Sequence, residues 1–413
     1  MCGQASEPGR SSSAWTRPPP RRSTRLASAT ARMRLLFTKR AYASVGGSES
    51  LAYQFATRLA ARGHEVRVLC AQAFDDRRVF SREGVEVVQV KPRGGFLGQV
   101  ADASTLVDLM RTDVLEWYAE DRELIHNVGR EYLDSSLDVA AGLDIPIVLT
   151  PLAHPGQFHG GDTSSDFARY KRADAVTTMT EWERSWFIDN GIDGARVVTT
   201  GMGPNATRSR EGAQFRAAHA IPADAPLVLY IGRKERYKGY IHLLDAAELV
   251  WRRHPDTRFV FIGIPGFYSS FFDEFARYAD ERIVDIERAS GVEKSAALDA
   301  CDVFAMPSIH ETFGIGYLEA WLHERPVVGG DIPPLREVIA HGVDGFCVRQ
   351  RADDVSGAIV RLLDDPVARA SMGRAGAAKL DERWGWDRVM DRVEDAYARA
   401  LGQPRAGLGE ALA

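Results

Sequence analysis

Cysteine and long apolar runs are scarce in this 413-residue sequence. Its four cysteines, Cys2, Cys70, Cys301 and Cys347, lack the CxxC or Cys/His spacing of a zinc site, and their scatter does not suggest a disulfide framework. We therefore expect a protein of the reducing cytoplasm with no structural metal. No apolar run approaches the roughly 20 residues that span a bilayer, so the chain is expected to be soluble or at most peripheral to a membrane.

Acidic residues are almost missing from residues 1–32, where six arginines stand against a single acid, Glu7. This segment also lacks the apolar centre of a secretory signal, and we interpret it as a disordered tail or an over-called start, although its composition also resembles an organellar transit peptide. Without these seven charges, the totals of 52 basic and 57 acidic residues become 46 and 56, a balance of −10. That balance predicts no nucleic-acid partner and no general attraction to anionic lipid.

From Met33 onward, short β-rich runs alternate with amphipathic helical stretches, which predicts parallel sheets covered on both faces by helices. The first half has predicted strands at 35–38, 65–69, 86–90, 123–126, 147–150 and 175–178, and predicted helices at 50–62, 105–118, 132–141 and 181–190. The alternation begins again with predicted strands at 227–231, 258–262, 283–286, 303–306 and 326–328. Two Rossmann-like domains in series are therefore expected. The GMGPN turn cluster interrupts the pattern, and the connection is expected at 201–217.

Ligands of open α/β sheets bind beyond the carboxyl ends of the strands, so the loops after strands are the candidate sites. The first loop, TKRAYASVGGSES, contains Gly46 and Gly47, which allow a close backbone approach, and Ser48 or Ser50 could cap the following helix. The loop GRKERYKG of the second half carries Arg233 and Lys238 in one turn. Two cations there suit a diphosphate, and ordinary surface charge is the alternative.

The stretch PSIHETFGIGYLEAW places Glu311 and Glu319 on either side of a Phe-Gly turn. At about 100° per residue, Glu319 falls within about 40° of Ile315, beside the apolar face of the predicted helix. An unpaired carboxylate buried there would cost several kcal/mol. The pattern therefore predicts either an internal Arg or Lys partner or a ligand that presents hydroxyl groups.

Together these motifs resemble the retaining, nucleotide-sugar-dependent glycosyltransferases of family 4, which have the GT-B fold. The resemblance covers nearly the whole chain from Met33 and includes Gly46-Gly47-x-Glu49, LAARGHEV, LYIGRKERYKG, ACDVFAMPSIHETFGIGYLEAW and RPVVGGDIPPLREVIAHGVDGF. It implies an α/β architecture of two Rossmann-like domains whose parallel sheets face a central cleft. The expected divisions are a tail at 1–32, an acceptor domain at 33–205, a donor domain at 206–385 and a C-terminal helix at 386–413 that crosses back to the first domain.

The resemblance also implies roles for individual residues. Arg233 and Lys238 would hold the donor diphosphate and offset the charge of the leaving group, Glu319 would accept hydrogen bonds from the ribose, and Glu311 would grip hydroxyls of the donor sugar. Further donor contacts are implied for Gly47 and for the backbone amides of Phe313, Gly314 and Ile315.

His154, in TPLAHPGQFHG, occupies the place of a family residue between donor sugar and acceptor. His159 and His126 are weaker candidates. The sequence departs from common family patterns at TTGMGPN and at ERASGV, where the domain hinge and the nucleobase loop are expected.

The implied reaction moves a hexosyl group from a nucleoside diphosphate sugar, expected to be a UDP-sugar, to a hydroxyl acceptor with retention. His154, Glu311, Arg233 and Lys238 are the expected catalytic residues, and neither a cofactor nor a metal ion is expected. The acceptor is a small molecule or a lipid, bound by loops near 91–99 and 154–162, and membrane contact through KPRGGFLGQ is the less favoured alternative. A sugar-nucleotide epimerase on the same fold and a catalytically silent nucleotide-sugar-binding subunit are the competing hypotheses.

Overall fold

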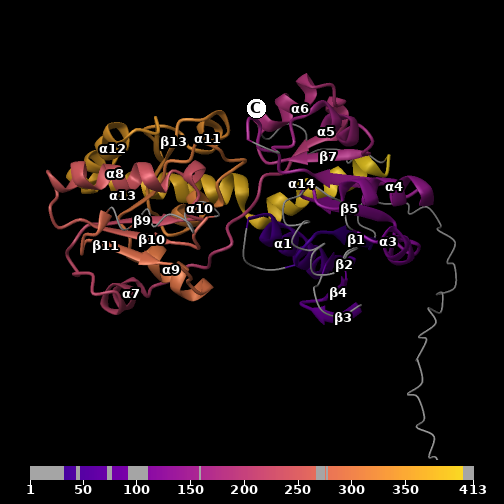
Figure 1. The fold of residues 1–413 in the computed structure, drawn as a ribbon, viewed down its shortest axis with the longest axis horizontal. Coiled ribbons are helices and arrows are strands. Elements are labelled where there is room, and N and C mark those ends of the chain that lie inside the picture. The colour runs from indigo at the N-terminus through magenta and orange to yellow at the C-terminus, as the bar shows by residue number, and fades with distance from the viewer. Residues whose placement is uncertain are drawn as a thin grey trace, which may run out of the picture.

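The computed structural model forms two α/β domains that lie side by side (Figure 1). It describes residues 32–42, 47–71, 77–91, 110–157, 160–266, 275 and 278–402. Within that part of the chain, none of the helices has the length and apolarity needed to cross a lipid bilayer.

The first domain is built on an eight-stranded sheet with the order β3-β4-β2-β1-β5-β6-β7-β8. The strands are β1 (Arg34–Thr38), β2 (Glu65–Ala71), β3 (Arg77–Arg82), β4 (Val85–Val90), β5 (Leu124–Val128), β6 (Ile147–Thr150), β7 (Ala175–Thr178) and β8 (Val197–Thr199). The helices are α1 (Gly47–Ala61), α3 (Thr112–Ala119), α4 (Leu133–Leu143), α5 (Ser164–Tyr170) and α6 (Glu181–Asp189). Central strands such as β5 are buried along their whole length, as expected for a sheet with helices on both faces.

The second domain is built on a six-stranded sheet with the order β11-β10-β9-β12-β13-β14, in which all the described pairings are parallel. Its strands are β9 (Leu227–Ile231), β10 (Arg258–Ile262), β11 (Ile283–Ile286), β12 (Val303–Met306), β13 (Val327–Gly330) and β14 (Gly345–Val348). Its helices are α7 (Gly212–Ala218), α8 (Tyr240–Trp251), α9 (Gly291–Ala300), α10 (Ile315–Leu322), α11 (Pro333–Val338), α12 (Ala352–Asp364) and α13 (Pro366–Lys379). The two-sheet architecture expected from the sequence is therefore confirmed.

Strand β3 was not predicted, because its sequence RRVFSR is largely exposed and polar and lacks an apolar face. It pairs antiparallel with β4 through a tight turn at Glu83 and Gly84, both of which have positive φ. The short strands β8 and β14 were also missed. The predicted connection at 201–217 is wrong in part, since α7 begins at Gly212 and packs against α9.

The C-terminal helix α14 (Trp386–Ala400) crosses back to the first domain, as expected (Figure 1). It contacts β6, β7, β8 and α1, and Val389, Val393 and Tyr397 are fully buried. The Tyr397 hydroxyl lies 2.7 Å from Nδ1 of His126 in β5. His126, a weak candidate for the site, instead holds this helix on the sheet.

Candidate active site

Lys238 and Glu311 meet at the carboxyl edge of the second sheet. Lys238 ends the short helical turn η2 (Arg236–Lys238) after β9, and Glu311 follows β12, the strand next to β9. The Lys238 Nζ atom donates to Glu311 Oε1 at 2.6 Å. Both side chains are largely buried, so they form a partly desolvated ion pair rather than a surface contact.

Gly239 allows the two loops to touch. Its φ of 79° is readily adopted by glycine, and a Cβ atom there would lie only 2.0 Å from the Pro307 carbonyl oxygen. The loop after β9 is therefore pressed against the loop after β12. Ser308, next to this contact, lies 3.3 Å from Glu311 Oε1 through its hydroxyl oxygen.

Arg233 lies in the same loop as Lys238, but its side chain is exposed. Its Nη2 atom donates to the Tyr237 hydroxyl at 2.6 Å, and the Tyr230 hydroxyl donates to the Arg233 carbonyl oxygen at 2.8 Å. The loop backbone is thus anchored to the buried Tyr230 while the guanidinium lies at the surface.

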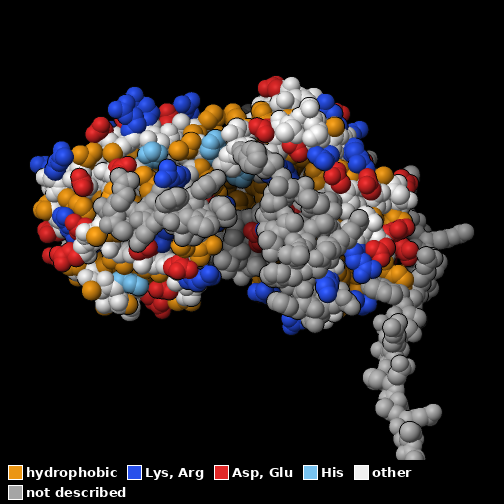
Figure 2. Space-filling model, in the orientation of Figure 1, with side chains coloured by type: hydrophobic (Ala, Val, Ile, Leu, Met, Phe, Trp, Pro, Cys, Tyr) orange, Lys and Arg blue, Asp and Glu red, His pale blue; other side chains and the backbone are white. Residues whose placement is uncertain are grey.

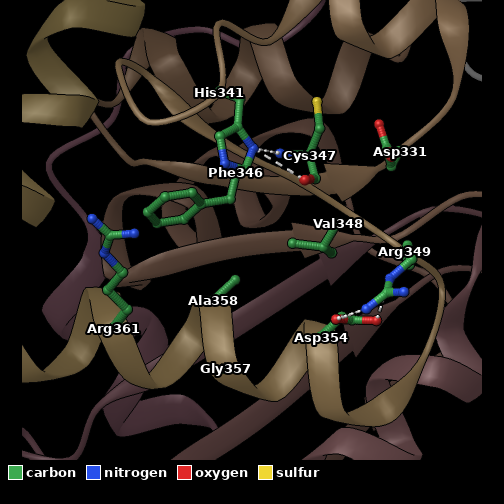
Figure 3. A pocket seen from close by; sticks show the side chains of 10 residues that line it. All are labelled: Asp331, His341, Phe346, Cys347, Val348, Arg349, Asp354, Gly357, Ala358 and Arg361. Atoms are coloured by element: carbon green, nitrogen blue, oxygen red, sulfur yellow. Dashed lines mark hydrogen bonds and ion pairs between the residues drawn. The ribbon is translucent and has the colours of Figure 1, made fainter.

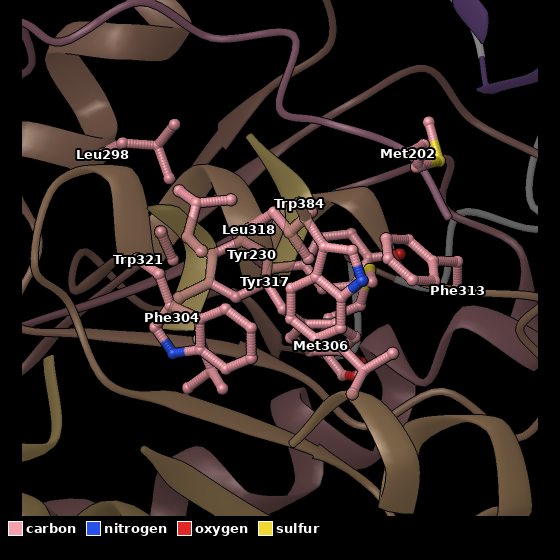
Figure 4. Packing of buried hydrophobic residues seen from close by; sticks show 14 of the residues in the cluster. Met202, Tyr230, Leu298, Phe304, Met306, Phe313, Tyr317, Leu318, Trp321 and Trp384 are labelled. Atoms are coloured by element: carbon pink, nitrogen blue, oxygen red, sulfur yellow. The ribbon is translucent and has the colours of Figure 1, made fainter. Parts of the chain in front are cut away.

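Glu319 has an internal lysine partner, which was one of the two alternatives that the sequence predicted. Its side chain in α10 is 1% exposed, and Lys294 of α9 donates to its Oε1 atom at 2.6 Å. Helix α10 begins at Ile315, after Gly314, whose φ is positive. Phe313, just before it, packs edge-on against Trp384, which stacks on Trp321 (Figure 4). This aromatic stack supports the amino end of α10, where the predicted backbone donors lie.

His154 reaches the second domain from the loop after β6. Burial, together with the charges of Lys238 and Arg130, lowers the pKa of His154 to about 4, and Glu311 acts in the opposite direction. The nearby Gly156 also faces the second domain, since a Cβ there would lie 3.8 Å from His310 Cε1. The two domains therefore meet at the His154 loop, near enough to the Lys238–Glu311 pair for its charges to act on the ring. Figure 2 shows the surface notched between the two halves.

A carboxylate of the second domain also caps a helix of the first. Glu337 in α11 accepts hydrogen bonds from the backbone N–H groups of Glu181 and Trp182 at 2.8 and 2.9 Å. These groups form the amino end of α6, where a carboxylate is favoured by the unpaired N–H groups and by the helix dipole. Burial raises the pKa of Glu337. We refer to this contact as the interdomain clasp, and no sequence motif indicated it.

Other predicted positions lie at the edges of the described chain. Gly47 begins α1 and is exposed, whereas Gly46 and His159 lie outside the described residues. The predicted capping role of Ser48 or Ser50 is wrong, because both residues lie inside α1, where Ser50 donates to the Gly47 carbonyl oxygen at 3.1 Å and Ser48 donates to Glu49. In the part of the chain described, no group of three or more His, Cys, Asp or Glu side chains is arranged to hold a metal ion.

A pocket of about 440 Å³ lies away from these residues, between β14 and α12 (Figure 3). It is lined by Asp331, His341, Phe346, Cys347, Val348, Arg349, Asp354, Gly357, Ala358 and Arg361. Arg349 is paired with Asp354 across it. None of the residues predicted for donor binding lines this pocket.

The family models match both halves of the chain. The model of glycosyl transferases group 1 matches residues 212–379, and that of the glycosyl transferase 4-like domain matches residues 46–203. Glycogen synthase of Mycobacterium tuberculosis is 27% identical over 398 residues, which cover 89% of this chain and 95% of that protein. D-inositol 3-phosphate glycosyltransferase of Kineococcus radiotolerans is 32% identical over 260 residues, 57% of this chain and 59% of that protein.

Two solved structures have the same fold. HepE of Anabaena, solved in complex with UDP and glucose, has a TM-score of 0.70 at 20% identity and covers 89% of this chain and 100% of its own. Sucrose-phosphate synthase of Thermosynechococcus elongatus has a TM-score of 0.71 at 18% identity and covers 90% of this chain and 100% of its own.

Proposed function

This chain belongs to the group 1 glycosyltransferases of the GT-B fold, and on that premise we propose that it moves a hexosyl group from a UDP-sugar to a hydroxyl acceptor, with retention and without a metal ion. The uridine donor is supported by HepE, which was solved with UDP-glucose. The observation that carries the proposal is the meeting of the Lys238–Glu311 pair with the His154 loop across the two domains.

The donor diphosphate is assigned to Arg233 and Lys238. Lys238 exchanges part of its contact with Glu311 for the phosphate oxygens, and the exposed guanidinium of Arg233 has the planar donor geometry that suits a phosphate. Cations already in place offset the charge that builds on the leaving diphosphate, an effect typically worth a few kcal/mol in the transition state. The backbone N–H groups at the start of α10 add to this positive field.

The sugar is assigned to Glu311 and His154, and the ribose to Glu319. Because its pKa is about 4, His154 is a neutral imidazole at pH 7 and can exchange hydrogen bonds with sugar hydroxyls without adding a charge. In the transfer, the bond from the anomeric carbon to the diphosphate oxygen breaks, and the bond to the acceptor oxygen forms on the same face. The proton of the acceptor hydroxyl passes to the departing phosphate oxygen, so no protein nucleophile is required.

The test measures donor consumption with and without acceptors. UDP-sugars that raise the melting temperature are incubated with a panel of polyols and sugars, with and without EDTA, and the anomeric configuration of the product is read by NMR. Acceptor-dependent transfer with retention, unaffected by EDTA, is the expected result. Conversion of the donor without an acceptor would indicate an epimerase, and binding without conversion would indicate a silent subunit.

A further inference from the structure

A second cluster of charged side chains lies at the carboxyl edge of the first sheet, and the proposed mechanism does not use it. Lys39 and Arg40 follow β1, Arg130 and Glu131 follow the neighbouring strand β5, and Glu49 lies in the first turn of α1. The next strand in the sheet is β6, which leads to His154. We call these five residues the first-domain cluster.

One pair in this cluster is structural. The Lys39 side chain is fully buried, and its Nζ atom donates to Glu131 Oε2 at 2.8 Å. Gly129, with a φ of 90°, leaves room for the pair, because a Cβ there would lie 2.2 Å from Glu131 Oε2. Asn127 donates to the Glu131 carbonyl oxygen at 2.8 Å and fixes the same turn. The Lys39–Glu131 pair therefore supports the cluster and is already neutral.

The Arg40 side chain makes weaker contacts than the Lys39 side chain does. Its guanidinium lies 4.0 Å from Glu131 Oε1 and 3.8 Å from Glu49 Oε1, which is too far for hydrogen bonds. Its Nε atom is buried and has no hydrogen-bond partner among the described residues. A buried donor without a partner is destabilising, and more so when it is charged. The side chain is still 27% exposed, so an incoming group can reach it.

Arg130 connects this cluster with the reaction centre. Its charge contributes to the lowered pKa of His154. On its other side it approaches Gly161, where a Cβ would lie 2.7 Å from Arg130 Cδ. The cluster holds three cations, Lys39, Arg40 and Arg130, against two carboxylates, Glu49 and Glu131. Its formal charge is therefore positive.

We propose that Arg40 and Arg130 bind an anionic group of the acceptor, so that the acceptor is a sugar or polyol that carries a phosphate or a carboxylate. This inference rests on the proposed function and adds the chemical class of the acceptor. The planar fork of a guanidinium matches the oxygens of either group, and an incoming oxygen would supply the partner that Arg40 Nε lacks. Bound there, the anion lies at the strand ends beside His154, and the rest of the acceptor extends toward the donor sugar.

The test is calorimetry of matched ligands in the presence of saturating UDP. The pairs are glucose 6-phosphate with glucose, glucuronate with glucose, and myo-inositol 1-phosphate with myo-inositol. Vesicles of phosphatidylcholine with phosphatidylinositol form a separate arm for a lipid headgroup. At least one anionic ligand should bind at least tenfold more tightly than its neutral counterpart. Binding to the vesicles alone would assign the anion to a lipid acceptor.

Variants identify the residues. Arg40→Gln and Arg130→Gln should each weaken binding of the anionic ligand at least tenfold and remove its preference over the neutral one, while Arg40→Lys should retain part of that preference. Arg172→Gln is the matched control. Arg172 lies just before β7, at the amino ends of the strands and so away from the cluster, and it pairs with exposed Asp138. Melting temperatures check that the variants fold.

Three results would overturn the inference: no binding of any anionic ligand, equal binding of the neutral counterparts, or unchanged anion binding in both glutamine variants. Failure of the proposed function is distinguishable, because it appears in the donor-consumption assay as a lack of acceptor-dependent transfer, whether or not UDP and the anionic ligands bind in calorimetry.

Discussion

Each of the two carboxylates proposed for donor binding is held by a lysine from a different element. Glu311 pairs with Lys238 from the loop after β9, and Glu319 pairs with Lys294 from α9. In the proposed mechanism, the two ion pairs respond differently when the donor binds. Lys238 must turn toward the diphosphate, whereas Lys294 can keep its contact while Glu319 also accepts from the ribose.

This difference predicts separate effects of two conservative substitutions. Glu319→Gln should weaken the affinity for free UDP about tenfold or more, because ribose contacts are the same in the ground and transition states. Glu311→Gln should lower kcat by roughly 10²-fold and leave the UDP affinity unchanged, because its contacts are to the moving sugar. Calorimetry with UDP and steady-state rates measure both, with the exposed Glu248→Gln as control. Equal losses of UDP affinity would contradict the assignment, and unchanged affinity in Glu319→Gln would leave Lys294–Glu319 as a purely structural pair.

His154 carries a second prediction at the residue scale. Its pKa is lowered to about 4, so the ring is neutral above that pH, and its titration should add no inflection to kcat between pH 5.5 and 8. The ring protons of His154, assigned by comparison with His154→Gln, should show the same midpoint by NMR. A midpoint near 6.5 would mean that the ring is solvated and does not face Lys238.

Among the elements, the packing of helix α14 on the first sheet depends on a neutral histidine. Burial lowers the pKa of His126 to about 3, and its two ring nitrogens lie 2.7 Å from the Tyr397 hydroxyl and from Thr150 Oγ1. Only a neutral ring can donate to one oxygen and accept from the other.

This arrangement predicts acid sensitivity. Because the folded pKa is below the unfolded value of 6.5, the unfolded chain binds the extra proton first. The stabilisation is therefore present above pH 6.5 and is lost as the pH falls toward 3, at about 1.4 kcal/mol per pH unit. The urea midpoint should fall between pH 7 and pH 5, and it should fall less in His126→Gln. An equal slope in His126→Gln would assign the acid sensitivity to other groups.

At the scale of the whole molecule, the interdomain clasp links domain closure to the site. Glu337 holds the amino end of α6, and Glu183 in the same helix accepts from the Met179 backbone N–H at 2.6 Å. Burial raises the pKa of Glu183 to about 8, and the nearby backbone N–H of Ala153 acts in the opposite direction. Ala153 precedes His154. The contact between α11 of the second domain and α6 of the first therefore helps to position the loop that carries His154.

Glu337→Gln should loosen this contact, because an amide presents N–H groups to the backbone N–H groups of α6 where the carboxylate presents only acceptors. We expect a larger radius of gyration in small-angle scattering and a loss of kcat/KM of about tenfold or more, with the UDP affinity unchanged. The exposed Glu248→Gln serves again as control. A drop in UDP affinity would place the effect within the second domain instead.

The elements and their order follow from local patterns in the sequence. Buried strands such as β6, β7, β9 and β12 were predicted with their observed bounds, since continuous apolar runs between turn residues are a local signal. The motifs proposed for donor binding were visible for the same reason, because Arg233 lies close to Lys238, and Glu311 to Glu319, along the chain. Strand β3 escaped prediction because an exposed edge strand needs no apolar face.

Which residues come into contact depends on how the elements pack in three dimensions. Helical periodicity placed Glu319 beside an apolar face, but its partner Lys294 depends on how α9 packs against α10. His126 was taken for the end of a strand, because its partner Tyr397 is 271 residues away. The clasp of Glu337 on α6 and the proposed anion site at Arg40 and Arg130 likewise join segments that are distant along the chain. Charged side chains are ambiguous in a sequence, because the same residue is a solvated surface charge or a binding group according to the neighbours that folding brings to it.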